Sequence, residues 1–476
     1  MVKHRQLRNK TGILAVILSA LLFLSLPAAA KVFNAQTFTL ENGLQVIVVP
    51  NHRAPVVTHM VWYKVGAADE PQNMSGMAHY FEHLMFKGTN TLAPGEFSKT
   101  VKKLGGNDNA FTGQDYTAYY ESIAVQHLEK MMEMEADRMV NLDVPEAHFK
   151  SEKSVVLEER RQRTENSPKT RFGEQVRSAL FVNHPYGTPT IGWMSEIKAY
   201  EWEDVKKFYD LYYAPNNAIV IISGDVTAKE VRPMTERTYG KLKPKDIPPR
   251  KRPQVAPANG DTLMTLQHKS INQRSFSNLR LAPSFNGNYD DALALEVLQE
   301  IMSGGPTTRL YKHLVVDRKR AIAVGLSYDG SALDDATIIY YGTPSDDVSL
   351  EELAADVKNE IRDVIENGVS KTEVNEAIQR LQDSADYARD SLSGPAMMIG
   401  YALTTGSTLD EVENWPEAIA KITAADIQRV AKTYLDDDQP WHRPAIQSHY
   451  LPVEESSSQI EDESNKEAWW FELIDQ

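Results

Sequence analysis

The segment His79-Tyr80-Phe81-Glu82-His83 decides how the rest of the sequence is interpreted. On a helix, residues i and i+4 lie one turn apart on the same face, so His79 and His83 can present two imidazole nitrogens to one ion. Glu82 then lies beside that ion and can hold an attacking water instead of binding the metal. Zinc lowers the pKa of a bound water and polarises the carbonyl under attack. A nearby carboxylate can take the proton and return it to a leaving amine.

A third protein ligand is needed, since catalytic zinc usually takes three protein ligands and a water. We expect a helix over Ser151–Arg163. One stripe of this helix consists of Glu152, Val155, Val156 and Glu159. Two acids on an otherwise apolar stripe are costly to bury unpaired, and a facing cation removes that cost. Glu158 points about 100° away, toward solvent. Spacing alone leaves a second interpretation open, a solvated acidic face paired with the arginines that follow.

The composition limits the chemistry that such a site can use. The chain has 476 residues and a formal net charge of −15, which argues against a general nucleic-acid-binding surface. It contains no cysteine, so disulfides, a thiolate nucleophile and cysteine-ligated zinc are excluded. Any metal site must use histidine and carboxylates. The G-x-S-x-G, Walker A and G-x-G-x-x-G motifs are also absent from the sequence.

The N-terminus has the pattern of a secretory signal peptide over residues 1–30. Four basic residues precede the uncharged apolar run Ile13–Leu26, and Pro27 with Ala28–Ala30 gives a small-residue cleavage signature. The run is short of the roughly twenty residues that span a bilayer. We expect cleavage, no stable membrane insertion afterwards, and a periplasmic location, where a chain without cysteine fits an oxidising environment. An uncleaved anchor is the alternative.

The rest of the chain predicts two similar halves. Asn42-Gly43 between two apolar runs indicates a hairpin, and Ser75 is the predicted N-cap of a helix over Met77–Phe86. Five prolines in residues 242–260 indicate a linker. Beyond it the pattern repeats, with 336–341 resembling 117–123, 350–365 replacing the Met-rich helix 127–140, and 423–434 echoing 200–212.

These observations predict an α+β protein and a specific division of the chain. The predicted parts are a signal peptide (1–30), an N-terminal metal-binding domain (31–241), a linker (242–260), a C-terminal domain without the metal motif (261–450) and an acidic tail (451–476).

The order His79-x-x-Glu82-His83 is the inverted zincin motif, and the sequence resembles the pitrilysin/insulinase family of zinc peptidases, to which the mitochondrial processing peptidase is related. The resemblance runs from about residue 35 to 445. It includes the following further segments: Glu41–Leu44, Phe86–Thr89, Gly105–Asn107, Asn109–Thr112, His184–Gly187 and Tyr213–Asn217.

The resemblance implies a role for each candidate residue. His79, His83 and Glu159 would bind one zinc ion per chain, Glu82 would be the catalytic base, and Glu152 a supporting acid. It also implies two homologous α/β-sandwich domains that face each other around a chamber. Peptide substrates would add as a strand to a sheet edge, which the match places at Asn109 and Ala110.

One departure from the family concerns the second half. Many active relatives carry there an Arg and, seven residues on, a Tyr that reach the substrate across the chamber. The matching stretch here, Leu314–Val324, has no such tyrosine and an apolar residue at the arginine position, while Arg309 and Tyr311 belong to an earlier helix. We therefore expect a homologous subunit to supply these contacts, in a heterodimer or a homodimer.

The sequence thus predicts a zinc metalloendopeptidase that hydrolyses peptides or unfolded polypeptides. The alternative is a non-catalytic peptide-binding or assembly subunit of a related complex. Spacing favours zinc, although manganese or cobalt could occupy a His₂Glu site.

Overall fold

The first half of the chain is built on a six-stranded sheet with the strand order β1-β2-β6-β3-β5-β4. The computed structural model describes residues 31–256, 258, 260–438 and 444–453. The six strands are β1 (Gln36–Thr39), β2 (Gln45–Pro50), β3 (Val56–Tyr63), β4 (Asn107–Thr112), β5 (Thr117–Ala124) and β6 (Ala218–Gly224). Only β2 and β6 pair in parallel. Every residue of β6 is buried, as a central strand requires, whereas β4 forms an edge and is half exposed.

The second half repeats this arrangement in a five-stranded sheet of order β7-β11-β8-β10-β9. Its strands are β7 (Thr262–Gln267), β8 (Ser275–Ala282), β9 (Ala321–Asp329), β10 (Ala336–Pro344) and β11 (Ile446–Leu451). Here β7 and β11 are parallel and the other pairs antiparallel. Strand β10 therefore occupies the place of β5, as the sequence repeat predicts, and β9 occupies the place of the edge strand β4.

Helices of the first half cover one face of its sheet. They are α2 (Met77–Leu84), α3 (Glu96–Lys103), α4 (Leu128–Val140), α5 (Glu146–Arg160), α7 (Met194–Ala199), α8 (Trp202–Tyr212) and α9 (Ala228–Arg237). Helix α6 (Pro168–Leu180) also belongs to the first half but packs outside this layer. Methionines of α4 are buried in the core between this layer and the sheet, so the Met-rich helix is a packing element. A π-helical turn, η3 (Arg161–Glu165), continues α5.

The second half has an equivalent helical layer. It consists of α10 (Tyr289–Ser303), α11 (Leu350–Asn367), α12 (Lys371–Asp390), α14 (Leu409–Glu413), α15 (Trp415–Ile419) and α16 (Ala424–Leu435), with the π-helical turn η7 (Tyr311–Asp317). Helix α13 (Gly394–Thr404) belongs to the second half but packs outside this layer. Helices α11 and α16 stand where the sequence repeat predicts them, after β10 and before β11. The α+β fold with two similar halves is thereby confirmed.

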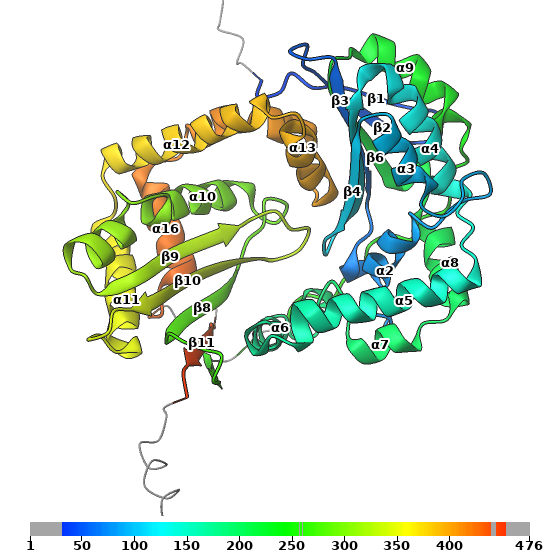
Figure 1. Cartoon of the computed structure of the whole chain (residues 1–476). Helices are drawn as coiled ribbons and strands as arrows, with labels where there is room; N and C mark the ends of the chain where they lie inside the picture. The colour runs from blue at the N-terminus through cyan, green and yellow to red at the C-terminus, as the bar shows by residue number, and fades with distance from the viewer. Residues whose placement is uncertain (1–30, 257, 259, 439–443, 454–476) are drawn as a thin grey trace, which may run out of the picture.

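The two halves exchange one helix each (Figure 1). Helix α13 of the second half packs on β3 and β6 of the first sheet, where Ile399 joins the cluster around Trp62. Helix α6 of the first half packs on β7, β8 and β11 of the second sheet, where Phe172 meets the ring of Tyr450. The exchange buries the second face of each sheet and ties the halves together across the space between them.

The predicted linker runs along both halves without forming a helix or strand in its described residues. The predicted domain boundaries stay predictions. The signal segment 1–30 and residues 454–476 of the acidic tail lie outside the described residues. Within the described part of the chain, none of the helices combines the length and apolar character that a membrane crossing requires.

Candidate metal centre

Helix α2 begins one residue later than the predicted Ser75 cap requires, and that prediction is wrong. The helix follows Gly76, whose backbone is left-handed with φ 85°, and no side chain of the preceding residue caps it. The carboxylate of Glu70 accepts hydrogen bonds from the N–H groups of Gly76 (2.8 Å) and Ala78 (2.7 Å) instead. The Ser75 hydroxyl is turned toward another loop, where it accepts from the backbone of Trp193 (2.9 Å). The helix also ends at Leu84 rather than at Phe86.

The apolar side of α2 fixes its rotation. Tyr80, Phe81 and Leu84 are buried in the core of the first half. The Tyr80 hydroxyl donates to the carbonyl of Phe149 on α5 (2.6 Å), which joins the two helices that carry the candidate ligands. Because Tyr80 and Phe81 point into the core, the motif residues on the other side of α2 face α5 and the space beyond it.

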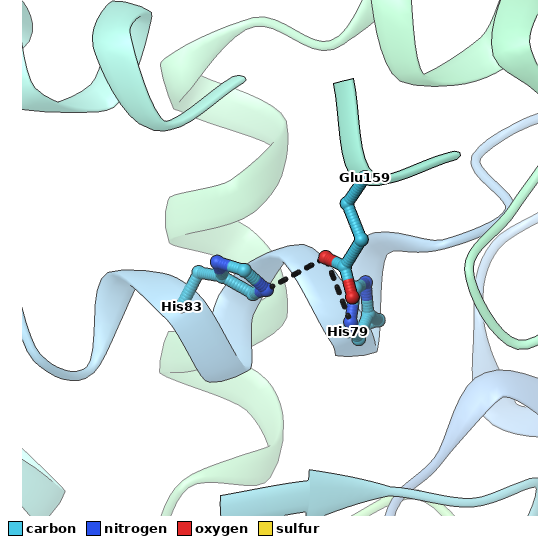
Figure 2. A group of neighbouring side chains, drawn as sticks. All are labelled: His79, His83 and Glu159. Atoms are coloured by element: carbon cyan, nitrogen blue, oxygen red, sulfur yellow. Dashed lines mark ion pairs between the residues drawn. The ribbon is translucent and has the colours of Figure 1, made fainter. Parts of the chain in front are cut away.

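The three predicted ligands lie together (Figure 2). The Oε2 atom of Glu159 is 3.3 Å from Nε2 of His83 and 3.7 Å from Nε2 of His79. One donor atom from each of these residues lies within 4.8 Å of the other two. Glu158, in contrast, points to solvent and pairs with Arg161 at 2.9 Å. Helix α5 therefore presents Glu159 and not Glu158 to the histidines.

This donor set fits a divalent cation. The Oε2 atom of Glu159 is buried and accepts no hydrogen bond, although both Nε2 atoms surround it. A buried carboxylate oxygen without a hydrogen bond is costly, and a cation between the three side chains would remove that cost. Two imidazoles and one carboxylate are the protein ligands of several catalytic zinc sites, which keep one further position open.

A second carboxylate, that of Glu152, contacts the ring nitrogen of His83 that does not face Glu159. Oε1 of Glu152 lies 2.9 Å from Nδ1 of His83, and its Oε2 lies 2.5 Å from Nζ of Lys87. Burial opposes protonation of His83, but the carboxylates of Glu152 and Glu159 outweigh it and raise its pKa to about 9. Burial lowers the pKa of His79 to about 4, so its imidazole is neutral. The Glu152 contact directs Nε2 of His83 toward Glu159 and His79.

Glu82 lies next to the three ligands without joining them. Its Oε2 atom accepts a hydrogen bond from the Thr112 hydroxyl of β4 (2.5 Å). Burial raises the pKa of Glu82, and the Thr112 hydrogen bond only partly offsets this. A carboxylate with a raised pKa is better suited to accept and return a proton near neutral pH. The sequence contained Thr112 and Lys87 within family segments but gave neither residue a role, because both contacts join separate elements.

A cavity of about 1050 Å³ opens in front of this group. The metal group, Glu82 and Glu152 line it, as do Asn109 and Ala110 of β4. In the described sheet, β4 pairs with β5 on one side only, so its other edge borders the cavity. The residues predicted to bind substrate thus lie beside the candidate metal ligands.

The second half contributes no lining residue to this cavity among the described residues. Arg309 is engaged elsewhere, in ion pairs with Glu373 (2.6 Å) and Asp363 (2.9 Å). Arg318 and Arg320 both pair with Asp356 of α11. The arginine and tyrosine contacts whose absence the sequence predicts are therefore not replaced by these side chains.

A His-x-x-Glu-His helix within an α+β half that is repeated once defines the inverted zincin class of two-domain proteins. The model of the insulinase family, peptidase family M16, matches residues 45–193, and the model described as the peptidase M16 inactive domain matches residues 201–381. The chain is 30% identical over 443 residues to the zinc protease PqqE of Helicobacter pylori, an alignment that covers 92% of this chain and 98% of the relative. The chain therefore belongs to the M16 insulinase family.

Solved structures agree with this assignment. A protease from Helicobacter pylori superimposes with a TM-score of 0.80 at 28% identity, and the superposition covers 89% of this chain and 100% of the protease chain. The periplasmic protease PqqL from Escherichia coli superimposes with a TM-score of 0.74 at 19% identity, over 89% of this chain and 48% of that chain. At that identity the second likeness concerns the fold alone.

Proposed function

We propose that this protein is a zinc metalloendopeptidase that hydrolyses peptides or unfolded polypeptides. The observation that carries the proposal is the convergence of His79, His83 and Glu159, from two helices, beside the carboxylate of Glu82, which Thr112 holds by a hydrogen bond. The name of the Helicobacter pylori relative, a zinc protease, supports the same chemistry.

In this mechanism each side chain has one task. His79, His83 and Glu159 hold the metal, which when bound polarises the substrate carbonyl and acidifies water. Glu82 takes a proton from the attacking water and delivers it to the leaving amine, and Thr112 keeps the Glu82 carboxylate in place. Glu152 fixes the ring of His83 as a positioning residue.

The substrate would bind as an extended strand along the free edge of β4. Asn109 and Ala110 line the cavity, and an added strand there would carry its peptide bonds past Glu82. The backbone supplies most of the hydrogen bonds in such binding, which suits substrates that are unfolded rather than defined by one sequence.

We also propose that activity requires a second, homologous subunit. Transition-state hydrogen-bond donors contribute roughly 10²–10³ each in rate, and no arginine or tyrosine from the described second half lines the cavity. The pairing, a periplasmic location after removal of residues 1–30, and the domain division belong to this proposal. Full peptidase activity of the isolated monomer would contradict the pairing.

The test compares wild type with Glu82→Gln and the matched control Glu158→Gln. Bound metal is measured by mass spectrometry, and cleavage of a mixed peptide library is measured with and without chelator. We expect Glu82→Gln to keep the ion and lose turnover, and Glu158→Gln to retain both. Loss of the ion in Glu82→Gln would instead place Glu82 among the ligands.

The alternative is a non-catalytic peptide-binding subunit. It is favoured by the match of residues 201–381 to a model described as an inactive domain. Metal retention without turnover, even with periplasmic extract added as a source of partners, would support this alternative over the peptidase.

A further inference from the structure

The second half contains a counterpart of the metal-binding helix pair. In chain order, α10 comes after β8 as α2 comes after β3. Helix α12 comes after β10 as α5 comes after β5, and β8 and β10 hold the places of β3 and β5 in the second sheet. The contacts correspond as well. Gln299 of α10 accepts a hydrogen bond from the backbone of β9, as Glu82 accepts one from β4. Glu300 of α10 accepts a hydrogen bond from Arg380 of α12, in the way that His83 of α2 contacts Glu152 of α5. Glu296, three residues before Gln299, therefore stands in the place of His79.

A separate cavity of about 330 Å³ opens at Glu296. Helices α10, α12, α13 and α15 and the N-terminal residues Val32 and Phe33 surround it, and Figure 1 shows α12 running above α10 with α13 beyond its end. Its walls are mainly apolar and aromatic, including Phe285, Tyr289, Leu381, Met398, Tyr401 and Trp415. This volume lies near the lower end of the volumes found for small-molecule sites, and it suits a ligand with about one aromatic ring.

The charge of this cavity has one sign. Its described lining includes two acidic residues, Glu296 and Glu411, and no lysine, arginine or histidine. The carboxylate of Glu411 accepts hydrogen bonds from Thr408 at the start of α14, which leaves Glu296 as the acid for a ligand. Glu300, on the same helix as Glu296, is neutralised by Arg380 at 2.5 Å. Oε2 of Glu296 accepts one hydrogen bond, from Nε1 of Trp415 (3.1 Å). Burial raises the pKa of Glu296 to about 7, so a nearby cation would readily hold it ionised.

The donor set differs from that of the first half. One carboxylate and a serine, Ser384, cannot replace two imidazoles and a carboxylate as metal ligands. An ammonium group needs only one carboxylate, and aromatic rings beside it add cation–π attraction. Apolar walls around a single acid thus fit an organic cation better than a metal ion.

We propose that this cavity binds a small organic amine, with its ammonium group on Glu296 and one apolar group against the aromatic walls. The site is independent of the metal centre, because no residue lines both cavities.

The test measures binding of 2-phenylethylamine and its neutral analogue 2-phenylethanol to the full chain by calorimetry, with chelator present. We expect the amine to bind at least about ten-fold more tightly than the alcohol, as a charge-assisted hydrogen bond implies. Glu296→Gln should weaken amine binding by a similar factor. Glu376→Gln, the same charge change on the exposed side of α12, should leave it unchanged.

A second variant, Ala388→Phe, narrows the cavity from the rim of α12 without changing Glu296 and should also abolish amine binding. Circular dichroism confirms the fold of each variant. Equal affinities for the amine and the alcohol, undiminished binding in Glu296→Gln, or no measurable heat at millimolar amine would overturn the proposal. None of these results depends on peptidase activity, so they leave the proposed function untouched.

Discussion

The contact between Glu152 and His83 illustrates how much of the candidate site depends on single residues behind the ligands. Glu152 is almost fully buried and bridges Nδ1 of His83 and Nζ of Lys87. Such a partner fixes which nitrogen of the ring faces the metal. The ammonium group of Lys87 keeps the carboxylate ionised, which preserves its hold on the imidazole.

We predict that Glu152→Gln weakens metal binding by about 10- to 100-fold, the usual effect of removing such a partner. The amide is nearly isosteric but no longer stabilises the imidazole orientation by charge. Competition with a chromogenic chelator measures the affinity. Glu158→Gln, an exposed carboxylate of the same helix, is the matched control. An equal loss in both variants would show that only the overall charge of α5 matters.

At the scale of single residues, the sequence predicts contacts within one helix but not contacts between separate elements. The i, i+4 spacing places His79 and His83 together, whereas the choice of Glu159 over a solvated acidic face needed the family resemblance. The Ser75 cap failed because the N–H groups of α2 are bound by Glu70, and because Gly76 packs against a distant loop. A side chain added at Gly76 would lie 2.3 Å from the carbonyl oxygen of Ile191.

A charged cluster buried between the first sheet and α4 supports the metal helix at the element scale. His59 of β3 contacts Glu121 of β5 (2.9 Å), while Glu135 and Arg138 of α4 pair with each other. The Arg138 guanidinium also lies over a group of aromatic rings, those of Phe86, Phe97 and Tyr119. Phe86 lies two residues after the end of α2, so this cluster braces the end of the helix that carries the motif.

We predict that Arg138→Met lowers the free energy of unfolding by about 3–5 kcal/mol, because it breaks a buried pair and leaves the polar atoms of Glu135 and Glu121 without their partner. Urea denaturation followed by circular dichroism measures the change. Arg161→Met removes an arginine that is half exposed and should cost less than about 1 kcal/mol. Similar losses in the two variants would mean that the buried cluster contributes no more than a surface pair.

The same cluster predicts a pH dependence of stability. Burial raises the pKa of Glu135 to about 8, against the attraction of Arg138. The folded protein therefore keeps a proton that the unfolded chain loses near pH 4.5, and this contribution to stability declines as pH rises from about 5 to 8. The slope is at most about 1.4 kcal/mol per pH unit. Glu135→Gln should remove this slope, which urea titrations at several pH values would reveal; an unchanged slope would contradict the assignment.

Elements with a regular apolar pattern or a known turn sequence were predictable from the sequence, and irregular elements were not. The Asn42-Gly43 hairpin forms, with Gly43 at φ 86°, and the strand repeat holds. The π-helical turn η3 carries no comparable signal, because its wider hydrogen-bonding pattern depends on packing against α6. Arg163 of this turn pairs with Glu159 at 2.7 Å, an i, i+4 contact of the kind that helical spacing predicts, and it adds a cation beside the candidate ligand.

Across the whole molecule, the sequence predicts two similar halves but not how they join. Each half contributes one helix that covers the sheet of the other half. The apolar residues of α6 and α13 would form the same pattern in the sequence whichever sheet the helices covered. The N-terminal residues add a further tie, since the buried carboxylate of Glu413 accepts hydrogen bonds from the backbone of Phe33 and Ala35. Such partners are hundreds of residues apart in the chain, beyond the reach of local patterns.

The predicted linker holds the two halves through Arg252. Its guanidinium pairs with Asp69 (2.8 Å) and Asp115 of the first half and with Asp334 (2.9 Å) of the β9–β10 loop of the second half. Only 5% of this side chain is exposed, and it is shared by all three carboxylates, although Arg250 also pairs with Asp69 and His184 with Asp334. The Tyr186 hydroxyl completes the junction, donating to Asp115 and accepting from the backbone of Asp334.

We predict that Arg252→Met loosens the contact between the halves, because three carboxylates would then repel one another across the junction. X-ray scattering should show a larger radius of gyration, and subtilisin should cut within residues 242–260 about ten-fold faster. Lys251→Met, at the exposed neighbouring position, should change neither value. If both variants scatter like wild type, the exchanged helices α6 and α13 alone hold the halves. The cavity in front of His79 would then keep its shape without the linker, so metal affinity, measured in parallel, should also stay unchanged.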